Sequence, residues 1–323
     1  MASSQFTLPP PDRQLYVHAF LDSSRPKVLA GPLKEAIKKV DPRTLSAEIQ
    51  QYAPADGLKV LQGTNVRDEL VFATPAVLRE QPAVLGYYRL LLGVSQKAFY
   101  TKSSGLSRYA SMEDQALIRP ALDPNIPDLC LALNSAIGLL ICSIPPGTLE
   151  ADVDQLPIMT LGAQADGSWR NKIGQKATIE VYQALKDVIK NAGYNYTDAG
   201  ASLTIVNSSG REVTLALAPD PDVEIKERLG SHDFLQAAIE IKGGSDNANI
   251  HNRAGEAEKS HQKAKARGAK EFWTIIASSK TDMAKLQAES PTTQQWFDIE
   301  HVRLAAGRDW DKLVNHVRIA MGI

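Results

Sequence analysis

Apolar residues in the first half of the chain recur mainly at helical spacing. The clearest case is Val84 to Tyr100, where they follow each other every three or four residues and predict one amphipathic helix. Between Thr101 and Arg119, Ser and Gly interrupt the pattern, which predicts a surface loop. Leu129 to Ser143 is almost wholly apolar and predicts a buried helix or strand. We therefore expect residues 1–165 to form a mainly helical region.

The second half alternates between the two periodicities. A change of texture at residues 163–174 marks the expected start of a second region, residues 166–323. The pattern then predicts, in order, a helix at Thr178 to Ala192, strands at Ser202 to Asn207, Glu212 to Ala218 and Phe234 to Lys242, a helix at Arg253 to Ala266, a strand at Glu271 to Ala277, and packing helices near 282–288 and 310–321. A strand, a helix and a further strand usually form a parallel crossover. The fold class is therefore α/β, with a mixed sheet flanked by helices.

Composition limits where such a protein works. The formal net charge is −1, so any affinity for nucleic acid must come from a local patch. The two cysteines, Cys130 and Cys142, lie in an apolar run and are expected to be free thiols, as in a reducing cytoplasm. The N-terminus lacks a signal-peptide pattern, and no apolar run approaches membrane-spanning length by this reading. We expect a cytoplasmic protein with no membrane association and no organic cofactor.

Charge changes sign along the stretch from Pro219 to Lys270. Residues 219–240 hold six acidic and two basic side chains, whereas residues 241–270 hold seven basic and three acidic ones. In a strand, Glu240 and Lys242 would share one face and Ile239 and Ile241 the other. Carboxylates on adjoining strands suit Mg²⁺, which takes one or two of them together with water and phosphate oxygens. The basic segment beside them favours a nucleic acid as the source of the phosphates.

The upstream carboxylate of this pair is open. Asp220, Asp222 and Glu224 are two residues apart and share a face of an extended segment. We favour Asp222 as the metal ligand because an alternating strand continues directly from it, and Asp220 is the alternative. Glu180, on the helix before the first strand, could add a distant contact or be a solvated helix residue.

These residues resemble a known pattern. Pro221-Asp222, followed by Glu240-Ile241-Lys242 on this order of helices and strands, resembles the PD-(D/E)XK nuclease core. Two segments are similar to the XcyI group of type II restriction endonucleases: EIKGGSDNANIHNRAGEAEKSHQKAKARG and, far upstream, YYRLLLGVSQKAFY. The resemblance implies a homodimer that binds the double-stranded palindrome CCCGGG and cuts after its first C with Mg²⁺.

The resemblance also implies roles for single residues. Asp222, or Asp220, and Glu240 would hold the metal, and Lys242 would position or help deprotonate the attacking water and stabilise charge on phosphorus. The segment from Gly243 to Lys259 is the candidate for reading bases, with close backbone approach at Gly243 and Gly244. Its candidate contacts are Asp246, Asn247, Asn249, His251, Asn252, Arg253 and Glu256.

Further contacts are expected along the following helix and in the N-terminal region. Lys259, Lys263 and Arg267 recur at helical spacing and are expected to line phosphates, although a solvated face or a pair between Glu256 and Lys259 is the plainer interpretation. In the N-terminal region, which is expected to contact DNA or to dimerise, the side chains that could reach a phosphate are Tyr87, Tyr88, Arg89, Lys97 and Tyr100. Their alternative is packing on a core.

Two other functions stay open on the sequence. A repair or junction-resolving nuclease could share the same fold, because fold alone does not fix the substrate. A non-catalytic DNA-binding module would need the acidic residues to be structural, which the complete Asp, Glu and Lys set argues against.

Overall fold

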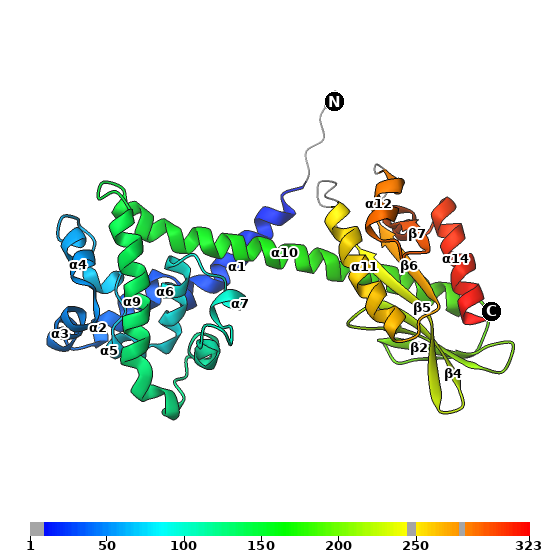
Figure 1. The fold of residues 1–323 in the computed structure, drawn as a ribbon, viewed down its shortest axis with the longest axis horizontal. Coiled ribbons are helices and arrows are strands. Elements are labelled where there is room, and N and C mark those ends of the chain that lie inside the picture. The colour runs from blue at the N-terminus through cyan, green and yellow to red at the C-terminus, as the bar shows by residue number, and fades with distance from the viewer. Residues whose placement is uncertain (1–9, 244–249, 278–281) are drawn as a thin grey trace, which may run out of the picture. The chain divides into compact units, whose positions relative to one another are not determined.

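The computed structural model describes residues 10–243, 250–277 and 282–323 (Figure 1). The chain divides into two compact units, Met1–Trp169 and Arg170–Ile323. The division falls inside one continuous helix, α10 (Leu149–Lys190), so the change of texture at residues 163–174 is not a break in secondary structure. The Gly and Ser residues of this segment are tolerated there because good helix formers surround them.

The first unit is helical throughout its described part. Before α10, its elements are α1 (Asp12–Val28), α2 (Ala30–Lys39), α3 (Pro42–Tyr52), α4 (Ala55–Leu61), η1 (Asp68–Leu70), α5 (Pro75–Glu80), η2 (Pro82–Val84), α6 (Leu85–Leu91), α7 (Gln96–Phe99), η3 (Ser107–Tyr109), α8 (Ala110–Gln115), η4 (Pro120–Asn125) and α9 (Ile126–Ser143). Apolar side chains from most of these elements form one core, with Leu33, Phe72, Tyr88 and Ile137 fully buried in it. The expectation of a mainly helical N-terminal part is confirmed.

Two local predictions in this unit are wrong in detail. Val84 to Tyr100 is not one helix: Gly93 takes a left-handed conformation (φ +71°) between α6 and α7, and the Ser95 hydroxyl caps α7 by accepting from Ala98 N. Thr101 to Arg119 is not simply a surface loop, since it contains η3 and α8. It folds there because Leu106, Tyr109 and Met112, spaced three apart, reach the core.

Helix α9 contains the most apolar run of the chain. The 24 residues Pro120–Ser143 are long and apolar enough to cross a membrane by length and composition, which corrects the expectation that no run reaches that length. One face of α9 is buried in the core of the first unit, and Asn134 is fixed there by accepting from Ala73 N (2.7 Å) and donating to Ala73 O (2.8 Å). A core helix of this kind passes the same test of length and composition.

The second unit is built on a mixed sheet. Within its described residues the strands are β1 (Tyr196–Asp198), β2 (Ser202–Val206), β3 (Glu212–Leu217), β4 (Val223–Leu229), β5 (His232–Lys242), β6 (Glu271–Ile276) and β7 (Gln295–Asp298), in that spatial order. Neighbours from β1 to β5 are antiparallel, whereas β5, β6 and β7 are parallel. The mixed α/β fold class is confirmed, but five strands precede the crossover helix, not three. The helix α11 (Ile250–Ala266) makes that crossover.

Helices cover both faces of this sheet (Figure 1). On one face, Ile225, Ile239 and Ile241 pack with side chains of α10 and α14 (Arg308–Met321). The opposite face lies against α11, where Ala264 contacts Ala238 and Phe272. The short helices α12 (Met283–Glu289) and α13 (Ile299–Arg303) complete the unit. Beyond the bulge in its pairing with β4, β5 alternates from Ala237 to Lys242, so its isoleucines face α10 and α14 and the Glu240 side faces α11.

Candidate active site

The expected acidic pair is brought together at the end of two adjacent strands. Val223 of β4 pairs with Ile239 of β5, so Asp222, which directly precedes β4, continues the register opposite Glu240. The Asp222 carboxylate is fixed there because its Oδ2 accepts from the backbone N of Ile241 at 2.8 Å. The antiparallel pairing of β4 with β5 therefore positions both carboxylates.

The two carboxylates lie in a poorly solvated place. Glu240 is 5% exposed, and burial followed by the charge of Asp222 raises its pKa to about 7. Burial also raises the pKa of Asp222. Two like charges that are both desolvated disfavour their ionised forms, whereas a cation between them would restore those forms. A bound cation would therefore stabilise this pair of carboxylates in their ionised forms.

Lys242 completes the predicted set on the same strand. Its Nζ lies 2.8 Å from Glu240 Oε1 and 3.5 Å from Glu256 Oε2. Burial alone would lower the pKa of the ammonium, but the neighbouring carboxylates, with Glu240 first, raise it above its ordinary value. Lys242 is therefore charged at neutral pH and can donate hydrogen bonds, but it cannot take a proton from water in this state.

Glu256 occupies a place that differs from both expectations for it. It lies in the second turn of α11, and its carboxylate reaches Lys242 instead of Lys259 or an unassigned base edge. Sequence spacing could not show this contact, because it depends on how α11 is placed on the sheet. Glu256 is therefore a neighbour of Lys242.

Asp220 and Glu224 flank Asp222 along the same segment and are held by α11. Lys263 Nζ contacts Asp220 Oδ2 at 2.5 Å, and the Lys263 hydrogen bond lowers the pKa of Asp220. Glu224 is 1% exposed and lies 2.6 Å from both Arg267 Nη1 and Lys226 Nζ. Burial would raise the pKa of Glu224, but these two cations lower it below its usual value. The arrangement supports Asp222 over Asp220 as the partner of Glu240.

The residues expected to contact DNA fall into three groups. Asp246, Asn247 and Asn249 lie outside the described residues. Lys263 and Arg267 pair inside the unit as above, and His251 Nδ1 lies 3.0 Å from Glu289 Oε1. Asn252 and Lys259 are exposed on α11, and Arg253 is half-buried in its first turn. The part of α11 that presents side chains to solvent near the carboxylates is thus its N-terminal half.

Two further sequence interpretations change. A Cβ at Gly243 would lie 2.0 Å from the Cβ of Ala177, so this glycine allows close approach of β5 to α10, not of a DNA backbone. Glu180 pairs with Arg303 Nε at 3.1 Å and, more loosely, with Lys176 at 3.6 Å. Its role in the structure is an ion pair at the helix surface.

The donor set fits a magnesium ion of the kind bound with few protein ligands. Among the described residues no three Asp, Glu, His or Cys side chains are arranged as a ready metal cage. Mg²⁺ commonly uses one or two carboxylates and takes its other ligands from water and phosphate. The crowded Asp222 and Glu240 carboxylates, and the Oδ1 of Asp220, which is buried without a hydrogen-bond partner among the described residues, supply acceptors of the required kind.

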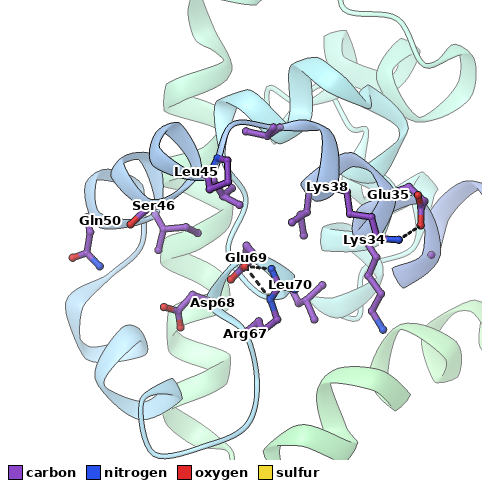
Figure 2. Close-up of a pocket in the computed structure, with 15 residues that line it drawn as sticks. Lys34, Glu35, Lys38, Leu45, Ser46, Gln50, Arg67, Asp68, Glu69 and Leu70 are labelled. Carbon is purple, nitrogen blue, oxygen red and sulfur yellow. Dashed lines mark hydrogen bonds and ion pairs between the residues drawn. The ribbon is translucent and has the colours of Figure 1, made fainter.

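The first unit has a separate hollow of about 810 Å³ between α2, α3 and η1 (Figure 2). Its wall is apolar at Leu45 and charged at the rim. Figure 2 shows Lys38 paired with Glu35 and Arg67 paired with Glu69. Lys34 and Asp68 also line this hollow. The carboxylates and the lysine that the sequence predicts as a catalytic set lie in the second unit.

Known proteins are similar to this chain over nearly its whole length. The family model described as XcyI restriction endonuclease matches residues 18–323. The chain is 34% identical over 311 residues to the type II restriction enzyme XcyI of Xanthomonas campestris pv. cyanopsidis, covering 95% of this chain and 93% of that enzyme. It is 33% identical over 313 residues to the type II restriction enzyme Cfr9I of Citrobacter freundii, covering 96% and 94%. Both similarities span the helical unit as well as the sheet.

Proposed function

Because the chain belongs to the XcyI restriction endonuclease family, we propose that it hydrolyses both strands of the DNA palindrome CCCGGG after the first C, as a Mg²⁺-dependent homodimer in the cytoplasm. The observation that carries the chemistry is the buried pair Asp222 and Glu240 with Lys242 beside it. The CCCGGG site and the homodimer rest on the family resemblance, since a palindrome offers two equivalent half-sites to a symmetric pair of subunits.

The carboxylates would hold the cation. Asp222 is oriented by Ile241 N, and Glu240 would lose its proton on binding because its pKa of about 7 lies close to neutrality. A bound Mg²⁺ supplies charge neutralisation at the phosphate and a more acidic bound water. The protein therefore needs to contribute orientation and a second positive charge.

Lys242 contributes that charge. Its ammonium, held by Glu240 and kept protonated by the surrounding acids, can donate to a non-bridging phosphate oxygen or to the attacking water. Of the three roles considered for Lys242, positioning of the water and charge stabilisation fit a protonated amine, whereas proton removal does not. Proton removal from water then falls to a carboxylate or to bulk solvent.

The DNA would lie along the N-terminal half of α11 and the segment before it. Arg253 is placed in the first turn, from which a side chain can reach a base edge, and exposed Lys259 can contact a phosphate. Asn252 and His251 supply further polar groups at the same end. Asp246, Asn247 and Asn249 keep their proposed role in base reading on the sequence alone.

Plasmid cleavage tests the proposal. We expect the wild-type protein with Mg²⁺ to give discrete fragments whose sequenced ends carry the CCCGGG cut. Glu240→Gln and Lys242→Ala should each slow single-turnover cleavage by about 10³-fold, as when one electrostatic contact to a transition state is removed. A matched control is Glu212→Gln, which changes an exposed acid on β3 that pairs with Arg228.

Other outcomes would favour the alternatives. Nicking only at branched or damaged DNA would indicate a repair nuclease of the same fold. A mobility shift with no cleavage in any divalent cation would indicate a binding module. Near wild-type rates in Glu240→Gln would remove this residue from the site.

A further inference from the structure

The acidic segment before β4 is tied to α11 by two ion pairs of different character. Asp220 pairs with Lys263, whose side chain is 67% exposed, while the Asp220 side chain is itself 30% exposed. Glu224 pairs with Arg267 and is 1% exposed. An exposed pair contributes little and exchanges partners easily, whereas removing the partner of a buried charge is costly. The Arg267 pair is therefore the anchor between α11 and β4, and the Lys263 pair is the exchangeable one.

The two carboxylate oxygens of Asp220 differ in their hydrogen bonding. Its Oδ2 accepts from Lys263, but its Oδ1 is buried and has no hydrogen-bond partner among the described residues. Buried carboxylate oxygens without partners are rare and call for an explanation, of which an ion that binds in another state is one. The charge of Asp220 also acts on Asp222 and Glu240, raising the pKa of each. Asp220 thus lies at the edge of the proposed metal site, but its carboxylate is paired with Lys263.

Lys263 is also the kind of group that a DNA backbone takes. It is an exposed ammonium on the basic side of α11, and phosphates bind such groups with release of their counterions. A phosphate oxygen is an anionic partner equivalent to a carboxylate for a lysine. A phosphate beside α11 would therefore compete directly with Asp220.

We propose that Lys263 restrains Asp220 in the free enzyme and that a DNA phosphate relieves this restraint, so that Asp220 joins Asp222 and Glu240 in binding the metal. The inference rests on the proposed function. It makes metal affinity depend on DNA through one named contact, and by reciprocity DNA affinity depends on the metal through the same contact. The intact Arg267 pair keeps α11 in place while Lys263 changes partner.

Calorimetric titration with Ca²⁺, used in place of Mg²⁺ to prevent cleavage, tests this restraint. Four proteins are compared without DNA: wild type, Lys263→Gln, Asp220→Asn and the double variant. Lys263→Gln should tighten Ca²⁺ binding by about two- to fivefold, the range of an exposed ion pair. In the Asp220→Asn background the same Lys263→Gln change should have no effect, because the residue that it releases is absent.

Two controls separate the restraint from general electrostatics. Lys259→Gln removes the same charge from the same helix, and within the described residues it has no ion-pair partner. We expect it to change Ca²⁺ affinity less than Lys263→Gln does. With a CCCGGG duplex bound, wild type and Lys263→Gln should converge in Ca²⁺ affinity, and Asp220→Asn should fall below both.

The proposal would be overturned if Lys263→Gln tightened Ca²⁺ binding equally in the wild-type and Asp220→Asn backgrounds. It would also be overturned if Lys263→Gln did not tighten Ca²⁺ binding, or if neither wild type nor Lys263→Gln bound Ca²⁺ detectably. Failure of the proposed function looks different. If Glu240→Gln leaves Ca²⁺ binding and plasmid cleavage unchanged, the metal site itself is misplaced. If Glu240→Gln abolishes both while the Lys263 cycle is additive, the site stands and only the restraint is wrong.

Discussion

Each unit contains a buried group of acidic and basic side chains, Arg89 with Glu113 in the first and Asp222, Glu240 and Lys242 in the second, and these two groups differ in how fully their hydrogen bonds and charges are satisfied. In the first unit Glu113 accepts from Arg89 Nε (2.9 Å), Arg89 Nη2 (2.6 Å) and Tyr100 OH (2.8 Å), while Arg89 Nη1 donates to Val94 O (2.6 Å). In the second unit Asp222 and Glu240 lie near a single lysine, burial raises the pKa of both carboxyls, and the charge of Asp222 raises that of Glu240 further. A closed network stabilises a fold, whereas an open one whose acids have perturbed pKa values is typical of a functional site.

The closed network should dominate stability. Glu113→Gln leaves the 1% exposed Arg89 without its charge partner, so we expect the free energy of unfolding to fall by about 3–5 kcal/mol. The paired replacement Arg89→Met with Glu113→Leu should recover much of this loss, because no buried charge remains. Chemical denaturation monitored by circular dichroism measures both, and a loss below about 1 kcal/mol for Glu113→Gln would contradict this view of the network.

The open network should respond to pH in the opposite sense to an ordinary salt bridge. The folded protein binds the proton of Glu240 more tightly than the unfolded chain does, so without metal the free energy of unfolding should fall as pH rises from about 4.5 to 7. The loss is about 3 kcal/mol, from a pKa difference of about 2.5 units between the folded and unfolded states.

Glu240→Gln supplies the control for this pH dependence. It removes the titrating group with little change of shape, so the slope of stability against pH should be reduced, and saturating Ca²⁺ should reduce it in the wild type. A slope that is unchanged in Glu240→Gln would assign the pH dependence to other groups.

In the second unit, much of the arrangement of the sheet and its acidic residues could be predicted from the sequence. Alternation in Ile239 to Lys242 correctly separated the isoleucines from Glu240 and Lys242, because strand periodicity fixes which face a side chain takes. The strand, helix and strand order correctly predicted the parallel pairing of β5 with β6. The short strands β1 and β7 were missed because three or four residues give too little periodicity.

The contacts made by α11 and the breaks in the first unit could not be predicted in the same way. Lys263 meets Asp220 and Glu256 meets Lys242 across more than a dozen residues of chain, and only the packing of the helix on the sheet brings them together. The break between α6 and α7 depends on the left-handed Gly93 and the Ser95 cap. Gly and Ser residues also occur within continuous helical patterns, so their presence in the sequence does not predict the break. The sequence predicts which side chains lie together within one strand, but it predicts contacts between separate helices and strands much less well.

The two candidate upstream acids should separate by kinetics. Asp222→Asn removes a carboxylate aligned by Ile241 N opposite Glu240, so we expect single-turnover cleavage with Mg²⁺ to fall by about 10²-fold or more. Asp220→Asn should cost less, about tenfold, because Asp220 joins the site only in part and from the edge. The reverse ranking of the two rates would transfer the main ligand role to Asp220.

The smallest effect concerns two basic side chains on α11 that we propose as DNA contacts. Arg253 stands in the first turn of the helix, where a side chain can enter the major groove, and Lys259 lies further along on the exposed side. Arg253→Ala should therefore lower the preference for CCCGGG over a scrambled duplex by about 1–3 kcal/mol, while Lys259→Ala should weaken both duplexes equally and reduce the salt slope of log K by about 1. Fluorescence anisotropy titrations in Ca²⁺ at several salt concentrations measure both quantities for both variants. Equal weakening of the two duplexes by Arg253→Ala would make Arg253 a phosphate contact, and base reading would then rest on Asp246, Asn247 and Asn249, where the same titrations can be repeated one residue at a time.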